Sequence, residues 1–381
     1  MDITISPSQL CGTVAAIPSK SQAHRMLICA AFAEGPTTLC CPQTNRDIEA
    51  TARCLRALGA EITYVNGIYH VLPVRCSSKS VELNCGESGS TLRFLLPIVG
   101  ALGVKAVFRM EGRLPQRPLS PLWEEMHRMG CSLSRLPDGS VLCEGKLQSG
   151  KYSIDGSVSS QFITGLMLAL PLIDGKTDLE ITGKVESVPY IEMTKRVIDM
   201  FGTGKTSYIV EGDWSNGAFF LAAGALGSPV TVEGLDPDSA QGDRAVSGLL
   251  SQLTANICTI CAADIPDLIP ILSVVAAANH GARFTQIGRL RLKESDRVTA
   301  IIAMLENLGG HAEATIDTLT VYPSKLLGGI VDGCNDHRIV MSAAIAATVC
   351  NMPVTISGAE AVNKSYPDFW AEYRRLGGQY E

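Results

Sequence analysis

The sequence predicts an α/β protein of two domains, each built from three copies of one repeated unit. The first observation behind this prediction is that apolar helices rich in small residues recur six times along the chain. The second is that most of them are followed by a short strand ending in glycine, and then by an amphipathic helix that stops at a glycine in the position of a left-handed cap. The third is size, because 381 residues fit two domains or one large one, and 46% hydrophobic side chains can bury a full core.

Each unit is expected to contain an apolar helix, a strand, an amphipathic helix and a pair of strands. The apolar helices are predicted at 26–33, 91–102, 162–172, 218–226, 268–278 and 339–350. The strands after them are predicted at 37–40, 107–112, 179–183, 230–234, 284–288 and 354–358, and only the first lacks the closing glycine. The amphipathic helices end at Leu58-Gly59, Met129-Gly130, Phe201-Gly202, Leu308-Gly309 and Leu376-Gly377, and the fourth copy is degenerate at Leu253-Thr254. The runs 61–65 and 68–72 alternate around an Asn-Gly turn, which predicts a hairpin.

One helix of each unit is more apolar than the other, which indicates sheets packed around an inner layer of helices. No linker rich in proline or serine is present, so a domain boundary must be a short crossing between units. The candidate crossings are Ile17–Ser19 and Glu211–Asp213.

Composition excludes several classes of function. A net charge of −6 argues against a general nucleic-acid or acidic-membrane partner. The chain begins without a basic, apolar leader and has no charge-free apolar run of the ~18 residues needed to span a membrane, so a cytoplasmic protein is expected. Thirteen cysteines, mostly in apolar segments, are expected to be reduced core residues. Cys258 and Cys261 form a lone CxxC without further ligands at zinc spacing, so neither a metal nor a cofactor is expected.

The start of the first apolar helix carries a candidate anion site. Pro18 sets an extended entry, Ser19 or Ser21 can cap the first turn, and the free N–H groups of that turn favour an anion. Lys20 and Arg25 add two cations at the same place. A solvated basic helix start is the alternative, and the recurrence of the pattern along the chain argues against it.

Polar residues of the same kind open the other helices of the repeat. The apolar helices begin at Glu87-Ser88-Gly89-Ser90 with Arg93, Ser159-Ser160-Gln161, Asp213-Trp214-Ser215-Asn216, Asp264-Ile265-Pro266-Asp267 and Asn335-Asp336-His337-Arg338. The amphipathic helices begin at Gln116-Arg117-Pro118, Ser187-Val188-Pro189-Tyr190, 291–297 and Asn363-Lys364-Ser365. Helix caps account for the serines, aspartates and asparagines, but not for the arginines, the histidine or the glutamine. If repeats of one hand point their helix starts the same way, these residues meet in a cleft and suit two small, highly anionic ligands.

Two carboxylates among these cations are candidates for acid/base catalysis. Glu294 and Asp267 would repel an anionic ligand, so simple anion binding does not explain them. Surface ion pairs on the helix at 293–297 are the alternative interpretation. The segment 85–91 has the glycines of a phosphate cradle but no Walker lysine, and neither GxGxxG after a strand nor GxSxG occurs, which argues against a kinase, a dehydrogenase or an α/β-hydrolase.

In these stretches the chain resembles the enolpyruvyl transferases, and among them the EPSP synthase family. The matches run in family order from the first helix to the last: Ser19-Lys20-Ser21 with Arg25, 87–93, 116–118, 159–162, 187–190, 265–267, 293–297, 335–338 and 364–368. The resemblance implies two domains, each of three βαβαββ-like repeats around an inner helical bundle. It places residues 18–212 in one domain, 1–17 plus 213–381 in the other, and the active site in the cleft between them.

The resemblance also implies the reaction. The family transfers the enolpyruvyl group of phosphoenolpyruvate (PEP) to the 5-hydroxyl of shikimate-3-phosphate and releases phosphate, on the shikimate pathway to chorismate and the aromatic amino acids. By the same resemblance we expect a monomer that needs no cofactor and that glyphosate inhibits competitively with PEP.

Roles for individual residues follow from the resemblance as well. The implied catalytic residues are Asp267, Glu294, Lys20 and His337. Shikimate-3-phosphate would be held by Lys20, Ser21, Arg25, Ser159, Ser160, Gln161, Ser187, Tyr190, Asp267 and Lys293, with the serine pair on its phosphate and Tyr190 against its ring. PEP would be held by Lys20, Gly89, Arg117, Gln161, Arg297, Arg338 and Lys364.

Two positions depart from the family pattern, since Glu87 and Arg289 stand where the family often has asparagine. One alternative is the related UDP-N-acetylglucosamine enolpyruvyl transferase, but that enzyme has asparagine where this chain has Ser21 and a loop cysteine where residues 109–121 have none. The other alternative is a ligand-binding relative without activity, which the presence of the proposed catalytic residues argues against.

Overall fold

The computed structural model describes residues 1–75 and 79–381 of the chain. The chain divides into two compact units. We call Pro18–Val210 the continuous unit, and Met1–Ile17 with Glu211–Glu381 the split unit. Each has its own hydrophobic core.

In its described residues, 18–75 and 79–210, the continuous unit contains three sheets. Its strands are β3 (Thr37–Cys40), β4 (Glu61–Val65), β5 (Ile68–Leu72), β6 (Ser80–Asn84), β7 (Lys105–Arg109), β8 (Cys131–Arg135), β9 (Val141–Gly145), β10 (Gly150–Asp155), β11 (Thr177–Thr182) and β12 (Ser207–Ile209). They are ordered β12-β3-β5-β4, β6-β7-β9-β8 and β10-β11. The helices are α1 (Lys20–Ala31), α2 (Arg46–Ala57), α3 (Gly89–Leu102), α4 (Leu122–Arg128), α5 (Ser160–Ala169) and α6 (Val188–Phe201), with short 3₁₀-helices η1 (Leu114–Gln116) and η2 (Leu170–Leu172).

The split unit has the same plan. Its strands are β1 (Ile3–Ser6), β2 (Gly12–Ala15), β13 (Val230–Glu233), β14 (Cys258–Cys261), β15 (Ala282–Thr285), β16 (His311–Ala314), β17 (Thr318–Tyr322), β18 (Gly329–Asp332), β19 (Val354–Ser357) and β20 (Gln379–Tyr380), ordered β18-β19-β1-β20, β14-β15-β17-β16 and β13-β2. Its helices are α7 (Trp214–Ala225), α8 (Val246–Ala255), α9 (Ile269–Ala278), α10 (Arg297–Asn307), α11 (His337–Ala346) and α12 (Phe369–Arg375). Its 3₁₀-helices are η3 (Gly242–Ala245), η4 (Gly288–Leu292), η5 (Ala347–Val349) and η6 (Ala359–Lys364).

The repeat closes each sheet with a strand from a neighbouring copy. Strand β6 belongs to the first copy but pairs in parallel with β7 of the second, and β7 then pairs antiparallel with β9. The predicted hairpin at 61–72 is confirmed, with Tyr64 opposite Tyr69. The prediction of a strand pair in every copy was wrong, because the third, fourth and sixth amphipathic helices are each followed by one strand. The strand after the third, β12, pairs with β3 of the first copy instead.

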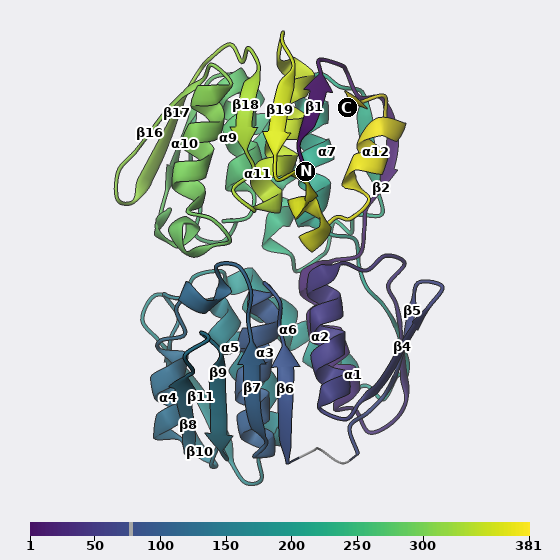
Figure 1. Ribbon diagram of the computed structural model, residues 1–381, viewed down its shortest axis with the longest axis vertical. Helices are drawn as coiled ribbons and strands as arrows, with labels where there is room; N and C mark the ends of the chain where they lie inside the picture. Colours follow the sequence, from purple (N-terminus) through teal and green to yellow (C-terminus); the bar gives the residue numbers. More distant parts are fainter. Residues whose placement is uncertain (76–78) are drawn as a thin grey trace. The chain divides into compact units, whose positions relative to one another are not determined.

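The apolar helices form the inner layer of each unit, as their composition predicted. Strands β7 and β9 cover α3, and β19 covers α11 (Figure 1). Helix α5 packs closely on α3, and a Cβ at Gly165 would lie 2.3 Å from the carbonyl oxygen of Arg93. Only glycine fits that contact. Among the helices of the described residues, none is both long and apolar enough to cross a membrane.

Candidate active site

Ser19, not Ser21, caps helix α1. Its hydroxyl accepts the backbone N–H of Gln22 at 3.4 Å, which leaves Lys20 as the first helical residue. The Lys20 ammonium lies 3.1 Å from Asp47 Oδ2 in the first turn of α2, and both side chains are about 15% exposed. Asp47 was not predicted, because only the packing of α1 against α2 brings it to Lys20.

Arg25 joins three helices of the continuous unit. The side chain is 2% exposed, and its Nε donates to Thr194 Oγ1 of α6 at 2.8 Å. Its Nη2 donates to Thr164 Oγ1 of α5 and to the Tyr190 carbonyl, both at 3.2 Å. Burial lowers the pKa of Arg25 to about 10, which still leaves it cationic at neutral pH. Arg25 therefore fixes α1 to α5 and α6, and contact with a ligand stays a prediction for it.

The start of α3 gathers two guanidinium groups. Ser88 caps the helix by accepting the Thr91 N–H at 3.3 Å. A Cβ on Gly89 would lie 2.6 Å from Arg93 Nη1 and 2.8 Å from Arg117 Nη1. Both cations therefore lie against the first residue of the helix, where free backbone N–H groups already favour an anion.

Arg93 also brings Gln161 to the start of α3. Its Nη1 donates to Gln161 Oε1 at 2.9 Å and its Nη2 to the Pro118 carbonyl at 3.2 Å. Gln161 Nε2 in turn donates to Ser90 Oγ at 3.0 Å. The structure thus unites Gly89, Arg117 and Gln161, three residues assigned to PEP, through an arginine that was seen in the motif but not assigned a role.

The serines assigned to shikimate-3-phosphate lie at the starts of α5 and α6. Ser159 caps α5 and accepts the Gln161 N–H at 3.3 Å, while Ser160 is buried. Ser187 precedes α6 with φ +57°, a left-handed conformation that is uncommon for serine, and Tyr190 is half-buried one turn later. Helices α5 and α6 pack against each other, so these serines open adjacent helices.

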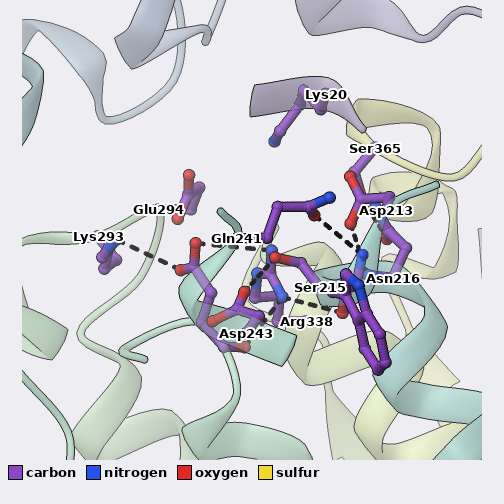
Figure 2. Close-up of polar contacts among 12 residues, drawn as sticks. Lys20, Asp213, Ser215, Asn216, Gln241, Asp243, Lys293, Glu294, Arg338 and Ser365 are labelled. Carbon is purple, nitrogen blue, oxygen red and sulfur yellow. Dashed lines mark hydrogen bonds and ion pairs between the residues drawn. The ribbon is translucent and has the colours of Figure 1, made fainter. Parts of the chain in front are cut away.

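In the split unit, three cations surround Asp267. Its Oδ1 lies 2.5 Å from Arg297 Nη1 and 3.3 Å from Lys293 Nζ, and its Oδ2 lies 3.6 Å from Arg338 Nη2. Figure 2 shows Lys293 and Glu294 close together, to the left of Arg338. Asp267 remains 20% exposed, so a ligand can reach the carboxylate.

Arg297 holds the second proposed catalytic carboxylate. Its Nη2 donates to Glu294 Oε2 at 2.6 Å, and its Nε donates to Asp336 Oδ2 at 2.8 Å. Arg297 and Asp336 are 1% and 0% exposed, whereas Glu294 is 19% exposed. The interpretation of these residues as surface ion pairs on a helix is therefore wrong.

The remaining assigned residues of the split unit lie at the start of α11 and beside it. Asp336 caps α11 through the Arg338 N–H at 3.0 Å, and His337 is its first, buried residue. Lys364 donates to the Asn335 carbonyl at 2.6 Å. Asn335 has φ +51°, so the turn before α11 directs this carbonyl to Lys364.

Electrostatics keep Asp267 ionised. Burial opposes ionisation, but Arg338, Lys293 and Arg297 together hold the pKa of Asp267 well below its usual range. Burial lowers the pKa of Lys293 to about 8, although the charge of Asp267 opposes this. An anionic ligand that draws these cations away would raise the pKa of Asp267 toward the range of a working base.

The described residues contain no group of three or more His, Cys, Asp or Glu side chains that could hold a metal ion. The expectation of core cysteines holds for half of the twelve at described positions: Cys41, Cys54, Cys85, Cys131, Cys143 and Cys350 are buried, whereas Cys11 and Cys261 are exposed. Chemically, the split unit offers two accessible carboxylates fixed by cations, and the continuous unit offers helix starts with arginines. Such carboxylates suit proton transfer, and such helix starts suit a phosphorylated, anionic ligand.

Known proteins resemble the whole chain. The sequence model of the family EPSP synthase (3-phosphoshikimate 1-carboxyvinyltransferase) matches residues 5–260 and 259–373. Proteins named 3-phosphoshikimate 1-carboxyvinyltransferase from Clostridium novyi and Clostridium kluyveri are 37% and 36% identical; the alignments cover 99% and 100% of this chain and 98% of each relative. A solved EPSP synthase from Acinetobacter baumannii superimposes with a TM-score of 0.79 over 100% of this chain and 99% of that one, at 23% identity. This likeness confirms the predicted fold class.

Proposed function

The chain belongs to the EPSP synthase (3-phosphoshikimate 1-carboxyvinyltransferase) family, and we propose that residues of both its units carry out that reaction on the same pair of substrates. The reaction transfers the enolpyruvyl group of PEP to the 5-hydroxyl of shikimate-3-phosphate. The observation that best supports the residue assignment is the cluster of Asp267 and Glu294 on one buried arginine, Arg297. A site for anion binding alone has no use for two carboxylates among its cations.

We assign the chemistry to these two carboxylates. The 5-hydroxyl must lose a proton while the PEP methylene gains one, which gives a tetrahedral ketal that then eliminates phosphate. Asp267, which its neighbours keep ionised, is the acceptor of the hydroxyl proton. Glu294 delivers the proton to the methylene. In the second step the C–O bond to phosphate breaks, the leaving phosphate takes up the proton held by Asp267, and the methyl group returns a proton to Glu294, which restores the C=C bond.

The cations stabilise charge on the substrates. Arg297, Arg338 and Lys364 suit the carboxylate and phosphate of PEP, since planar guanidinium groups bind such anions in forks. Gly89 and Arg117, with Gln161, form the corresponding group in the continuous unit. We place Ser159 and Ser160 on the phosphate of shikimate-3-phosphate. As phosphate leaves, these donors stabilise its growing charge, a contribution that often dominates catalysis.

Lys20 and His337 were also assigned to catalysis. Lys20 is held by Asp47 at a helix start in the continuous unit, where its charge can serve either substrate. His337 is buried beside Asp336, so it suits a role in shaping the start of α11. Both assignments stay predictions.

One assay tests the proposed function. Phosphate should be released only when shikimate-3-phosphate and PEP are both present, and a new enolpyruvyl ether should appear in equal amount. Release with UDP-N-acetylglucosamine in place of shikimate-3-phosphate would support the related transferase instead. No release with either acceptor would contradict the proposal.

Cell fractionation and sedimentation would test the cytoplasmic location and the monomeric state, which stay predictions.

Because the pKa of Lys293 is lowered, we expect shikimate-3-phosphate to bind more weakly at high pH. The pKa of Lys293 is about 8 in the folded protein, so each pH unit above 8 leaves about tenfold less of the charged form. The KM for shikimate-3-phosphate should rise between pH 7 and pH 9 and return when the pH is lowered. Lys293→Met should have a raised KM at all pH values and lose this dependence, while the same change at the exposed Lys325 should have no effect. A wild-type KM that is constant over this range would contradict the assignment.

Gly89→Ala should weaken the binding of glyphosate more than the binding of PEP. The new methyl group would meet the ends of Arg93 and Arg117, which must shift, and the longer inhibitor has less room to follow. The ratio of the glyphosate inhibition constant to the KM for PEP should therefore increase. Gly35→Ala, where a Cβ meets nothing within 4 Å, is the matched control. An unchanged ratio for Gly89→Ala would remove Gly89 from the PEP site.

A further inference from the structure

Asp243 is a buried carboxyl group that the proposed mechanism does not use. It lies in η3 of the split unit and is 1% exposed. Its Oδ2 accepts a hydrogen bond from the hydroxyl of Ser215 in the first turn of α7, and its Oδ1 has no hydrogen-bond partner. No cation of the described chain forms an ion pair with it, which is unusual for a buried aspartate.

Asp243 is linked to the proposed PEP ligand Arg338 through Ser215. Arg338 Nη1 donates to the carbonyl of Ser215 at 3.4 Å and to the carbonyl of Asp267 at 2.9 Å. Ser215 thus contacts Asp243 through its hydroxyl and Arg338 through its backbone. Figure 2 shows Ser215, Asp243 and Arg338 turned toward one another.

The charged groups that act on Asp243 are few. Arg338 is the cation, and Asp267 and Asp213 are the anions. Helices α7 and α8 pack against η3; α8 has no ionisable residue, and Asp213 is the cap of α7. The two anions and the buried position favour a neutral Asp243, and Arg338 with the Ser215 hydroxyl favours the ionised form.

Burial dominates this balance, and with the charge of Asp267 it raises the pKa of Asp243 to about 7. An ionised carboxylate here would keep one buried oxygen without a hydrogen bond, which is costly, whereas the neutral acid avoids the charge. The group can therefore change its charge near neutral pH.

We propose that Asp243 is a positioning residue that supports Arg338 through Ser215 as a neutral carboxylic acid, and that anion binding at Arg338 draws a proton from solvent onto it. In the neutral state it holds Ser215 without repelling the ligand. In the ionised state it adds a negative charge close to a site for a negatively charged substrate. The inference rests on the proposed function in one respect, namely that Arg338 binds PEP.

The protonation state can be measured without any substrate. Infrared spectra of the ligand-free protein should show the C=O band of a neutral carboxylic acid below pH 7, and the band should disappear as the pH rises to 8.5. Asp243→Asn should lack this band, and Asp174→Asn, at a side chain that is 98% exposed, should retain it. If the wild type has no such band, or if Asp243→Asn retains it, the proposal is overturned. Because this measurement does not depend on activity, it separates failure of this inference from failure of the proposed function.

Binding measurements test the effect on the substrate. We compare the dissociation constant of PEP at pH 6 and pH 8.5, measured with shikimate-3-phosphate present. It should rise more in the wild type than in Asp243→Asn, by about tenfold for each unit by which bound PEP raises the pKa of Asp243. The comparison between variants cancels the titration of PEP itself. At pH 6, where both side chains are neutral, the two proteins should bind PEP equally within a few-fold. Equal pH profiles, or a loss of more than tenfold at pH 6, would show that Asp243 does not act through its proton.

Ser215→Ala gives an independent test that keeps the carboxyl group. Loss of the hydroxyl donor should move the titration of the infrared band to higher pH, because that hydrogen bond favours the ionised form. An unchanged midpoint would contradict the proposed geometry.

Stability gives a further check, since a carboxyl with a raised pKa stabilises the fold at low pH and loses that contribution as the pH rises through 7. Asp243→Asn should therefore gain stability relative to the wild type at pH 8 and not at pH 4.

Discussion

Glu294→Gln should slow turnover by at least the ~10²-fold typical of a lost general acid, with both substrates still bound at near-normal affinity. The amide oxygen can still accept the Arg297 Nη2 hydrogen bond that Glu294 Oε2 accepts at 2.6 Å, so the cluster keeps its geometry. The amide cannot deliver a proton to the PEP methylene. Because the interaction is lost only in the transition state, kcat should fall while the KM values change little.

Steady-state kinetics and calorimetric binding of both substrates would measure this. Glu306→Gln makes the same change at an exposed position of α10 and should have wild-type kinetics. Turnover of Glu294→Gln within a few-fold of the wild type would show that Glu294 is not the acid. A rise in the KM for PEP with unchanged kcat would instead assign it to binding.

Arg297→Met should destabilise the split unit by about 3–5 kcal/mol, the usual cost of removing one partner from a buried ion pair. Arg297 is 1% exposed and satisfies Asp267, Glu294 and Asp336, and Asp336 is itself fully buried. Methionine leaves these carboxylates together without their shared cation. Denaturant unfolding would measure the loss, and Arg291→Met, at a guanidinium 35% exposed and 3.3 Å from Asp296, should cost only ~0–1 kcal/mol.

The pH dependence of the free energy of unfolding should reverse in Arg297→Met. In the wild type, burial opposes ionisation of Asp336, but Arg297 lowers its pKa, and the pKa of Asp267 is lowered as well. Their contribution to stability is therefore present above the ordinary carboxyl pKa and is lost as the pH falls. Without Arg297 the same carboxyls should bind protons more tightly in the folded state, so the variant should lose stability as the pH rises from about 4 to 7. The double variant with Asp336→Asn should recover part of the stability, and a variant no less stable than Arg291→Met would contradict the role given to Arg297.

The assignment of Arg25 shows where the sequence argument reached its limit. Its place at a helix start predicted an anion ligand, which stays a prediction, and did not reveal that its donors also bind Thr164, Thr194 and the Tyr190 carbonyl. Those partners lie more than a hundred residues away along the chain, and nothing local marks them. Asp47 lies 27 residues from Lys20 and Arg93 lies 68 residues from Gln161, and nothing local marks these pairs either.

The sequence by itself determined the repeat, the two-layer units and the family. Periodic apolar helices, strands ending in glycine and capped helix starts are local features, so they are visible without any contact between distant segments. It also determined which residue types open the helices, and hence which side chains are candidates for the chemistry. The family resemblance then assigned those residues roles that remain to be tested.

Only the tertiary structure decided which of these side chains interact and in what state of charge. Asp267, Glu294 and Asp336 became one cluster because α9, α10 and α11 pack with their N-terminal segments around Arg297. Asp243 gave no signal in the sequence, where it is one aspartate among many in an acidic chain. Its properties come from burial and from Ser215 and Arg338, and desolvation depends on every neighbour that excludes water, which only the folded chain specifies.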